Sequence, residues 1–371
     1  MGDLAVGDEI FDDLGRSCRV TLTTPIMHGK ECYRLTFSDG STIIADSEHL
    51  WEVERKICRR LGTNGPRRHE WKTEVLMTRD MASRVHAADR KRFRYRVRVA
   101  QPLQTPVSDL PIDPYVLGIW LGDGTTRSGQ ITVHESDREI LDHIAVCGMW
   151  SQVQRRTPTG TLTVALRLPS EDPALCPRGH TLSEVGRYDC GSCKRCCRDR
   201  YDGRPMPRRD TFSRRLRTLD LRMNKHIPPA YLRAGIDQRL ALLQGLLDSD
   251  GTVSAKGNVL FTNTNARLAD EFFELAASLG YRPAMRQSKH GAARAERRCA
   301  AEMRSRLPSP RMPRFPCSGW EGNAPAFAPL RPGSREMLQL GASYRLSRSK
   351  ASRCVASKST AQIISSSPVR R

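Results

Sequence analysis

The sequence lacks any long apolar run, and it lacks an apolar leader at its start. In its 371 residues no hydrophobic stretch approaches the roughly 20 residues that a membrane-spanning helix needs. The first residues, MGDLAVGDEIFDD, are acidic and contain no apolar segment of the secretory type. We therefore expect a cytoplasmic protein with no membrane association. Its length predicts two or three domains.

Negative charge is scarce relative to positive charge. Lys and Arg number 61 against 40 Asp and Glu, which gives a net charge of +21. A field of this size favours a polyanionic partner, most simply double-stranded DNA. The alternative is a basic surface that is merely solvated.

Cysteine is not distributed like a disulfide framework. Five of the twelve cysteines fall within residues 176–197, and the chain has no secretory signal, so the cluster indicates a metal site. Two pairs of possible ligands stand in this cluster: Cys176, His180, Cys193 and Cys196. Their spacing suits structural Zn²⁺ in tetrahedral coordination. Cys190 or Cys197 could replace one ligand, and a loop of reduced cysteines is the alternative.

The cysteine cluster lies in residues 172–205, which we predict to form a small zinc-binding insertion. Basic residues accompany the cysteines in this segment. Lys194 and Arg195 are candidates for contacts with DNA phosphates.

Residues 1–104 have the pattern of a β domain. CYRLTFSDGSTIIADSEHLWEV contains two short alternating segments around an Asp-Gly turn. In RKRFRYRVRVA arginines alternate with apolar residues, so one strand face can pack while the other carries charge. The charged face is a candidate DNA contact through Arg92, Arg94 and Arg96. The alternative is an edge strand kept soluble by its charge.

Residues 110–289 contain an internal duplication. The order helix–strand–helix–strand recurs, and residues 171–208 interrupt the first copy. The expected helices are residues 115–121, 138–145, 238–249 and 266–279. The expected strands are residues 130–134, 161–168, 258–262 and 281–288.

Two apolar helices of this duplication end in Asp-Gly-Thr: VLGIWLGDGT (116–125) and QGLLDSDGT (244–252). Small residues three to four positions apart would let these helices touch, and Asp123 and Asp250 would then meet at their ends. The following residues, Gly124 and Gly251, are expected to stop the helices as C-terminal cap glycines. Two carboxylates at helix C-termini are unfavourable unless a divalent cation lies between them. Such pairs are suited to phosphodiester hydrolysis, although an ordinary helix pair with Asp-Gly turns is the alternative.

LGIWLGDG and QGLLDSDG resemble the paired motifs of LAGLIDADG (dodecapeptide, DOD-type) homing endonucleases. NKHIPPAYL (224–232) resembles the Lys-x-Ile-Pro segment of intein-borne members. The resemblance implies that Asp123 and Asp250 bind Mg²⁺ and that Lys225 is catalytic, whereas Asp248 receives no catalytic role. It also implies an αββαββα saddle of two antiparallel sheets on DNA. Because the repeats are in tandem, we expect a monomer.

The N-terminal region resembles the Hint domain of inteins in the segments DLAVGDEIFDDLGR, TIIADSEHLWEV and VAQPL. His49 matches the histidine that polarises the scissile amide, and Asp46 replaces the usual Thr. The chain begins Met1-Gly2 and ends SSSPVRR, where a splicing intein has Cys or Ser first and His-Asn last. Because splicing needs those nucleophiles, we expect a degenerate, splicing-defective Hint domain.

Residues 290–371 show neither helical nor strand periodicity. They hold 14 Arg and 2 Lys against 4 Glu and no Asp, a composition typical of disorder. In a shifted reading frame, one permitted translation from Cys354 is RCIEVDSANHLFLAGPS, which resembles a late Hint strand. Our hypothesis is a frameshift near residue 290 and no ordered structure beyond it. The alternative is a naturally disordered basic tail.

The sequence therefore predicts an α+β chain with an all-β N-terminal domain, a tandem-repeat saddle, a zinc insertion and a disordered tail. The leading function is metal-dependent, site-specific double-strand DNA cleavage. The alternatives are a non-catalytic DNA-binding remnant and a protein-splicing intein.

Overall fold

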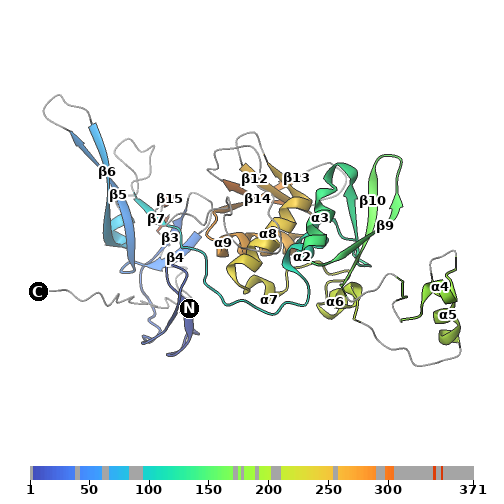
Figure 1. Cartoon of the computed structure of the whole chain (residues 1–371). Helices are drawn as coiled ribbons and strands as arrows, with labels where there is room; N and C mark the ends of the chain where they lie inside the picture. The colour runs from blue at the N-terminus through green and yellow to red at the C-terminus, as the bar shows by residue number, and fades with distance from the viewer. Residues whose placement is uncertain are drawn as a thin grey trace, which may run out of the picture. The chain divides into compact units, whose positions relative to one another are not determined.

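The structure is a computed structural model in which the chain is described over the following residues: 3–37, 42–60, 67–82, 95–169, 174–176, 179–188, 192–201, 210–253, 258–289, 297–304, 337–339 and 344–345. The chain divides into two compact units (Figure 1). The first comprises residues 1–105, 277–284 and 328–371, and the second comprises residues 106–276 and 285–327. In these described ranges no helix has the length and apolar character needed to cross a membrane.

The first unit is built mainly from antiparallel strands. Its strands are β1 (Glu9–Phe11), β2 (Ser17–Arg19), β3 (Cys32–Thr36), β4 (Thr42–Asp46), β5 (Leu50–Arg60), β6 (Arg67–Met77), β7 (Tyr95–Arg98), β15 (Met337–Gln339) and β16 (Tyr344–Arg345). They form a β1–β2 pair, a sheet in the order β16-β3-β4 and a sheet in the order β15-β7-β5-β6. One short helix, α1 (Thr78–Ala82), follows β6. The unit therefore has the β-rich character predicted from its alternating sequence.

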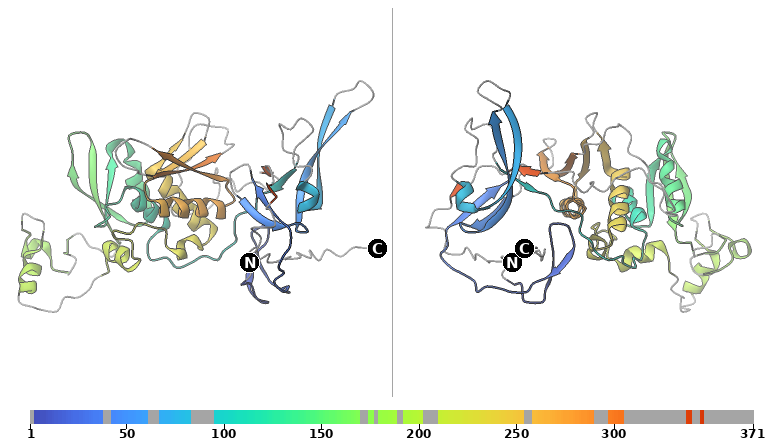
Figure 2. Two further views of the ribbon diagram at one scale, coloured as in Figure 1. Left: turned by 180° about the vertical axis from the view of Figure 1, so that it is seen from behind. Right: turned by 60° about the vertical axis from the view of Figure 1, so that its left-hand side comes forward.

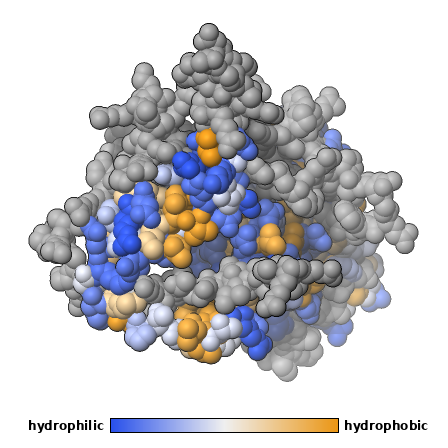
Figure 3. Space-filling model, turned by 90° about the vertical axis from the view of Figure 1, so that its left-hand side faces the viewer, coloured by the Kyte–Doolittle hydropathy of each residue, from blue (hydrophilic) through white to orange (hydrophobic). Residues whose placement is uncertain are grey.

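The core of the first unit is small. It consists of six buried residues: Leu35, Phe37, Ala45, Val53, Met81 and Tyr95. Several apolar residues reach the surface instead, among them Ile43, Ile44 and Val75. Hydrophobic patches are visible beside hydrophilic ones in Figure 3.

The expectation of no ordered structure beyond residue 290 is wrong for three segments. β14 (Arg297–Arg304) pairs with β12, β15 pairs with β7, and β16 pairs with β3. A neighbouring strand can stabilise a segment through backbone hydrogen bonds that its side-chain pattern does not reveal. The segment from residue 354 onward, on which the frameshift hypothesis depends, lies outside the described residues.

The second unit contains the predicted duplication. The first repeat comprises α2 (Pro114–Asp123), β8 (Gln130–His134), the 3₁₀ helix η1 (Glu135–Asp137), α3 (Glu139–Val146), β9 (Trp150–Arg156) and β10 (Thr161–Arg167). The second comprises α8 (Ile236–Asp250), β11 (Gly251–Val253), β12 (Asn258–Asn263), α9 (Ala266–Ser278), β13 (Pro283–Lys289) and β14. β9 was not predicted from the sequence, because its seven residues are all exposed and show no alternation of burial.

The two repeats share one topology. Their sheets have the orders β8-β10-β9 and β11-β12-β14-β13, so the last strand of each repeat lies between two earlier ones. The glycine after each motif helix occupies the same place, since Gly124 bridges to Ile131 and Gly251 pairs with Phe261. Figure 2 shows the sheet of the first repeat in green and that of the second in orange, with the motif helices between them.

Between the repeats, the described residues form the short helices α4 (Leu182–Val185), α5 (Lys194–Tyr201), α6 (Phe212–Thr218) and α7 (Pro229–Leu232). The motif helix α2 begins where the sequence dictates. Asp113 Oδ1 accepts hydrogen bonds from the backbone N–H groups of Tyr115 and Val116, and Pro114 starts the first turn.

Candidate active site between the motif helices

Helices α2 and α8 touch through their small residues, as the sequence predicts. A Cβ on Gly118 would lie 2.8 Å from the backbone N of Leu246, and a Cβ on Gly245 would collide with the carbonyl oxygen of Tyr115. One turn further on, a Cβ on Gly122 would overlap the Ser249 side chain. The backbones are therefore in contact, and an alanine at either central glycine would force the helices apart.

The glycines that end the helices act differently from our expectation. Gly124 has φ −75° and Gly251 has φ −89°, so both are extended rather than left-handed. The requirement for glycine is instead steric. A Cβ on Gly124 would lie 2.6 Å from Cδ1 of Trp120, and a Cβ on Gly251 would lie 2.8 Å from Cα of Leu247.

Asp123 and Asp250 lie at the adjoining ends of the two helices, and both are half-buried. Burial raises the pKa of Asp123 to about 6, and the negative charge of Asp250 contributes to this rise. Burial also raises the pKa of Asp250. Two partly desolvated carboxylates that repel each other are a donor set that fits a hard divalent cation.

Lys225 supplies the positive charge beside this pair. Its Nζ donates a hydrogen bond of 2.9 Å to the carbonyl oxygen of Gly122 and lies 5.3 Å from the centroid of the Trp120 ring. Burial lowers the pKa of Lys225 to about 8, although both carboxylates oppose that shift. The amine therefore titrates closer to neutral pH than an ordinary lysine does.

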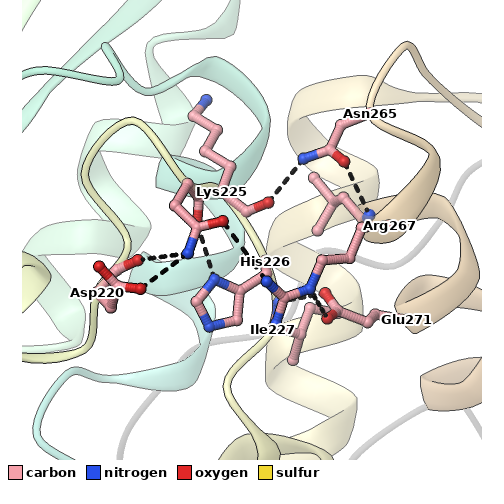
Figure 4. Close-up of polar contacts among 9 residues, drawn as sticks. Asp220, Lys225, His226, Ile227, Asn265, Arg267 and Glu271 are labelled. Carbon is pink, nitrogen blue, oxygen red and sulfur yellow. Dashed lines mark hydrogen bonds and ion pairs between the residues drawn. The ribbon is translucent and has the colours of Figure 1, made fainter.

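The segment that carries Lys225 is anchored to α9. Asn265 Nδ2 donates a hydrogen bond of 2.7 Å to the carbonyl oxygen of Lys225, and the backbone N–H of Ile227 donates one of 2.6 Å to Glu271 (Figure 4). Two non-glycine residues in the preceding turn are left-handed, with φ 54° at Asp220 and φ 58° at Met223. Strained turns of this kind persist where the surrounding contacts fix them. The contacts to α9 therefore fix the position of the lysine.

Asn263 is a site residue that the sequence reasoning missed. Its Nδ2 donates a hydrogen bond of 2.9 Å to Asp250 Oδ2, which lowers the pKa of that carboxyl against the effect of burial. Gly251 pairs with Phe261, and Asn263 stands two residues after Phe261. In the first repeat Gly124 bridges to Ile131, so Val133 has the position that corresponds to Asn263. Valine cannot donate such a bond. The two carboxylates are consequently inequivalent.

Asp248 makes a structural contact with Tyr115 and is not part of the Asp123–Asp250 pair. Tyr115 Oη donates a hydrogen bond of 2.9 Å to Asp248 Oδ2, and His143 Nδ1 lies 3.4 Å from the same hydroxyl. This bond crosses from α2 to α8. It therefore ties the two motif helices together.

The four predicted zinc ligands lie together in the second unit. The Nδ1 atom of His180 lies 3.6 Å from Sγ of Cys176, 3.6 Å from Sγ of Cys193 and 3.3 Å from Sγ of Cys196. All four ligand atoms lie within 4.8 Å of one another, which is compatible with tetrahedral Zn²⁺. His180 Nε2 lies 3.4 Å from Asp199 Oδ2, the type of contact that orients a metal-binding imidazole.

This geometry selects among the alternatives left by the sequence. Cys196, not Cys197, joins the four-residue cluster, and Cys190 lies outside the described residues. The basic candidates Lys194 and Arg195 are exposed on α5, next to Cys193.

The remaining predicted residues lie in the first unit. Arg96 donates a 2.7 Å hydrogen bond to the buried Glu54 and stacks 3.4 Å above the Trp71 ring, so a contact with DNA would require this pair to open. Arg92 and Arg94 lie outside the described residues. His49 packs edge-on against Trp51 at 5.0 Å, and its backbone N–H donates to the carbonyl oxygen of Asp46.

Part of the chain is similar to a known family of domains. Residues 237–303, from the start of α8 into β14, match the LAGLIDADG-like domain. One of the two predicted motifs, QGLLDSDG, lies within this matched range. A solved structure of mesophilic variants of the homing endonuclease I-DmoI aligns with 52% of this chain and 88% of its own length, at 13% identity and a TM-score of 0.30.

Two replicative DNA helicases are also similar to the chain. DnaB of Mycobacterium intracellulare is 35% identical over 289 residues, which are 76% of this chain and 40% of the helicase. DnaB of Mycobacterium leprae (strain TN) is 47% identical over 57 residues, which are 15% of this chain and 9% of the helicase. The chain thus spans less than half the length of these relatives.

Proposed function

We propose that the chain is a site-specific, metal-dependent endonuclease that cuts both strands of double-stranded DNA. The observation that carries the proposal is the half-buried pair Asp123 and Asp250 at the ends of two helices in backbone contact. The LAGLIDADG-like domain over residues 237–303 supports it, because that family consists in general of DNA-cleaving hydrolases.

Each side chain has a separate task in this proposal. Asp123 and Asp250 would hold Mg²⁺, which when bound supplies an activated water and stabilises the leaving oxygen. Lys225 carries positive charge to the reacting phosphate from its fixed position beside Gly122. Asn263 holds the Asp250 carboxylate in one orientation. Zn²⁺ held by the four-residue cysteine–histidine cluster would have a structural task only.

An intein origin is part of the same proposal. The region shared with the Mycobacterium intracellulare helicase covers 76% of this chain and 40% of the helicase. An element inserted into a longer host protein would give such proportions. The pairing of β15 with β7 and of β16 with β3 brings late and early segments of the chain into one β-rich unit, which supports an intein origin.

Plasmid cleavage distinguishes this function from that of a non-catalytic DNA-binding remnant. The full chain is incubated with plasmids that carry candidate insertion sites, in Mg²⁺ and in EDTA. Linear product that forms only with Mg²⁺ supports the endonuclease. Binding of the same plasmids without cutting supports the remnant.

A further inference from the structure

Helix α5 has an exposed face on the side away from the cysteine–histidine cluster. Three residues form this face: Lys194, Arg198 and Tyr201, which stand four and three residues apart and so share one side of the helix. All three are exposed. Cys196 and Asp199 lie on the other side of α5, where both contact the imidazole of the cluster. The helix therefore separates a metal-binding side from a basic side.

The positive charge of the exposed face is not neutralised within α5. The helix has four basic residues and one acidic residue, Asp199, whose Oδ2 lies 3.4 Å from His180 Nε2 on the cluster side. In the part of the chain that the structure describes, neither Lys194 nor Arg198 makes an ion pair. Exposed positive charge of this kind attracts a polyanion.

Two exposed tyrosines accompany the basic residues. Tyr201 is 93% exposed, and Tyr188, in the segment before α5, is 49% exposed. Lys194 Nζ lies 5.8 Å from the centroid of the Tyr188 ring, so this ring stands beside the first residue of the helix. Tyrosine hydroxyls donate hydrogen bonds to DNA phosphates, as lysine and arginine side chains do. The face thus combines charged and uncharged donors for phosphate oxygens.

The metal cluster fixes the orientation of α5, which has no buried residue of its own (Figure 1). Cys193 immediately precedes the helix and Cys196 lies in its first turn, so two of the four ligands hold it. The backbone N–H of Lys194 also donates a hydrogen bond of 3.2 Å to the carbonyl oxygen of Gly186. A helix of eight residues is marginal without such support. Zn²⁺ in the cluster would therefore hold the basic face in place.

We propose that Lys194, Arg198 and Tyr201, together with Tyr188, form a surface that binds the phosphate backbone of double-stranded DNA, in addition to the paired carboxylates. Phosphates repeat regularly along each strand and accept hydrogen bonds from cationic and hydroxyl donors alike. Because these contacts carry no sequence information, the surface binds DNA of any sequence. Arg195, the other basic candidate from the sequence, lies to one side of this face. The surface would bind DNA whether or not the chain cleaves it.

Two pairs of neutral substitutions on the same helix test the surface. Lys194→Gln/Arg198→Gln removes two charges from the face. The matched control, Arg195→Gln/Arg200→Gln, removes two charges from exposed positions on either side of it. Zinc content and melting temperature of each full-length protein are measured first, and both should match the wild type.

Binding to a labelled duplex without a candidate insertion site is then measured by fluorescence anisotropy over a series of NaCl concentrations. The buffer contains neither Mg²⁺ nor a chelator, so that zinc stays bound. For the face variant we expect roughly fivefold weaker binding or more, and a slope of log K against log [NaCl] that is shallower by about 2, at about 0.9 for each phosphate no longer neutralised. The control pair should change both quantities much less.

The tyrosine contact has a different signature. Tyr201→Phe should weaken binding roughly threefold, as expected for one lost hydrogen bond, and should leave the salt slope unchanged because the hydroxyl carries no charge.

Four results would overturn the proposal. The face variant could bind DNA with the affinity and salt slope of the wild type. The control pair could lose as much affinity, which would mean that the net charge of α5 attracts DNA without a specific face. The face variant could lose zinc, which would assign its side chains to the fold of the metal module. It could keep its affinity for DNA while losing affinity for polyglutamate or phosphatidylserine vesicles, which would assign the face to an acidic protein or a membrane.

Discussion

The amine of Lys225 donates a hydrogen bond of 2.9 Å to the carbonyl oxygen of Gly122, the residue that precedes Asp123. This bond joins the segment between the repeats to the end of α2. It also places the positive charge next to two carboxylates whose pKa values are raised by burial. Lys225 therefore offsets the negative charge of both carboxylates.

Removal of that charge should slow cleavage and move its pH dependence. In Lys225→Met the pKa of Asp123 should rise above about 6, because the lysine is the group that lowers it. We expect a loss of roughly 10²-fold in cleavage rate and a pH profile shifted to higher pH. Rates from pH 5.5 to pH 9 provide the measurement, and Lys225→Arg, which keeps the charge, is the control. An unshifted profile would show that the lysine does not act on the carboxylates.

Asp123→Asn should stabilise the folded protein at pH 8. Since the folded pKa of about 6 exceeds the ordinary value of 3.8, the ionised carboxylate costs stability, and this cost grows as pH rises from the ordinary value to the folded pKa. The full shift would correspond to roughly 3 kcal/mol. Because the carboxylate is partly exposed and solvent screens it, we expect a gain of about 2 kcal/mol at pH 8 and none below about pH 4. Thermal melts in EDTA measure it. Added Mg²⁺ should raise the melting temperature of the wild type more than that of the variant.

Asn263→Ala should make the two strand cuts unequal. The variant removes the hydrogen bond that orients Asp250, whereas Asp123, with Val133 at the corresponding position, loses no hydrogen bond. Nicked plasmid should accumulate before linear product appears. The ratio of nicked to linear DNA over time measures this effect, and Asn263→Gln, which keeps an amide, is the comparison. Equal slowing of both strands would mean that Asn263 does not distinguish the two carboxylates.

Zinc should bind in a ratio of one ion to each chain. Cys176→Ser and Cys193→Ser should each abolish binding, because both thiols lie in the four-residue cluster, while Cys197→Ser should retain the ion. Elemental analysis of the purified proteins measures the content. Loss of zinc from Cys197→Ser alone would show that the ligand set is wrong.

The helix pair could be predicted from sequence because its contact depends on spacing along one helix. Gly118 and Gly122, like Gly245 and Ser249, stand four residues apart and therefore share a helix face. The zinc ligands followed in the same way from the spacing of Cys and His pairs. Lys225 has no such local signal, and only the resemblance to intein-borne endonucleases identified it.

The elements that were missed depend on long-range pairing. Asn263 reaches Asp250 only because β12 returns beside the end of α8. β14 to β16 carry no alternating pattern, and partner strands elsewhere in the chain hold them. The extended conformation of Gly124 and Gly251 was missed because the steric demand comes from Trp120 and Leu247, and a cap pattern does not contain that information.

The most direct test of the account is cleavage by carboxylate variants that remain folded. Wild-type chain, Asp123→Asn, Asp250→Asn and the double variant are incubated in Mg²⁺ with a plasmid that the wild type cuts, and their melting temperatures are compared in parallel. The account predicts that the wild type makes double-strand breaks, that both single variants lose them, and that the double variant still binds DNA but cuts neither strand. Double-strand cleavage by the folded double variant would contradict it.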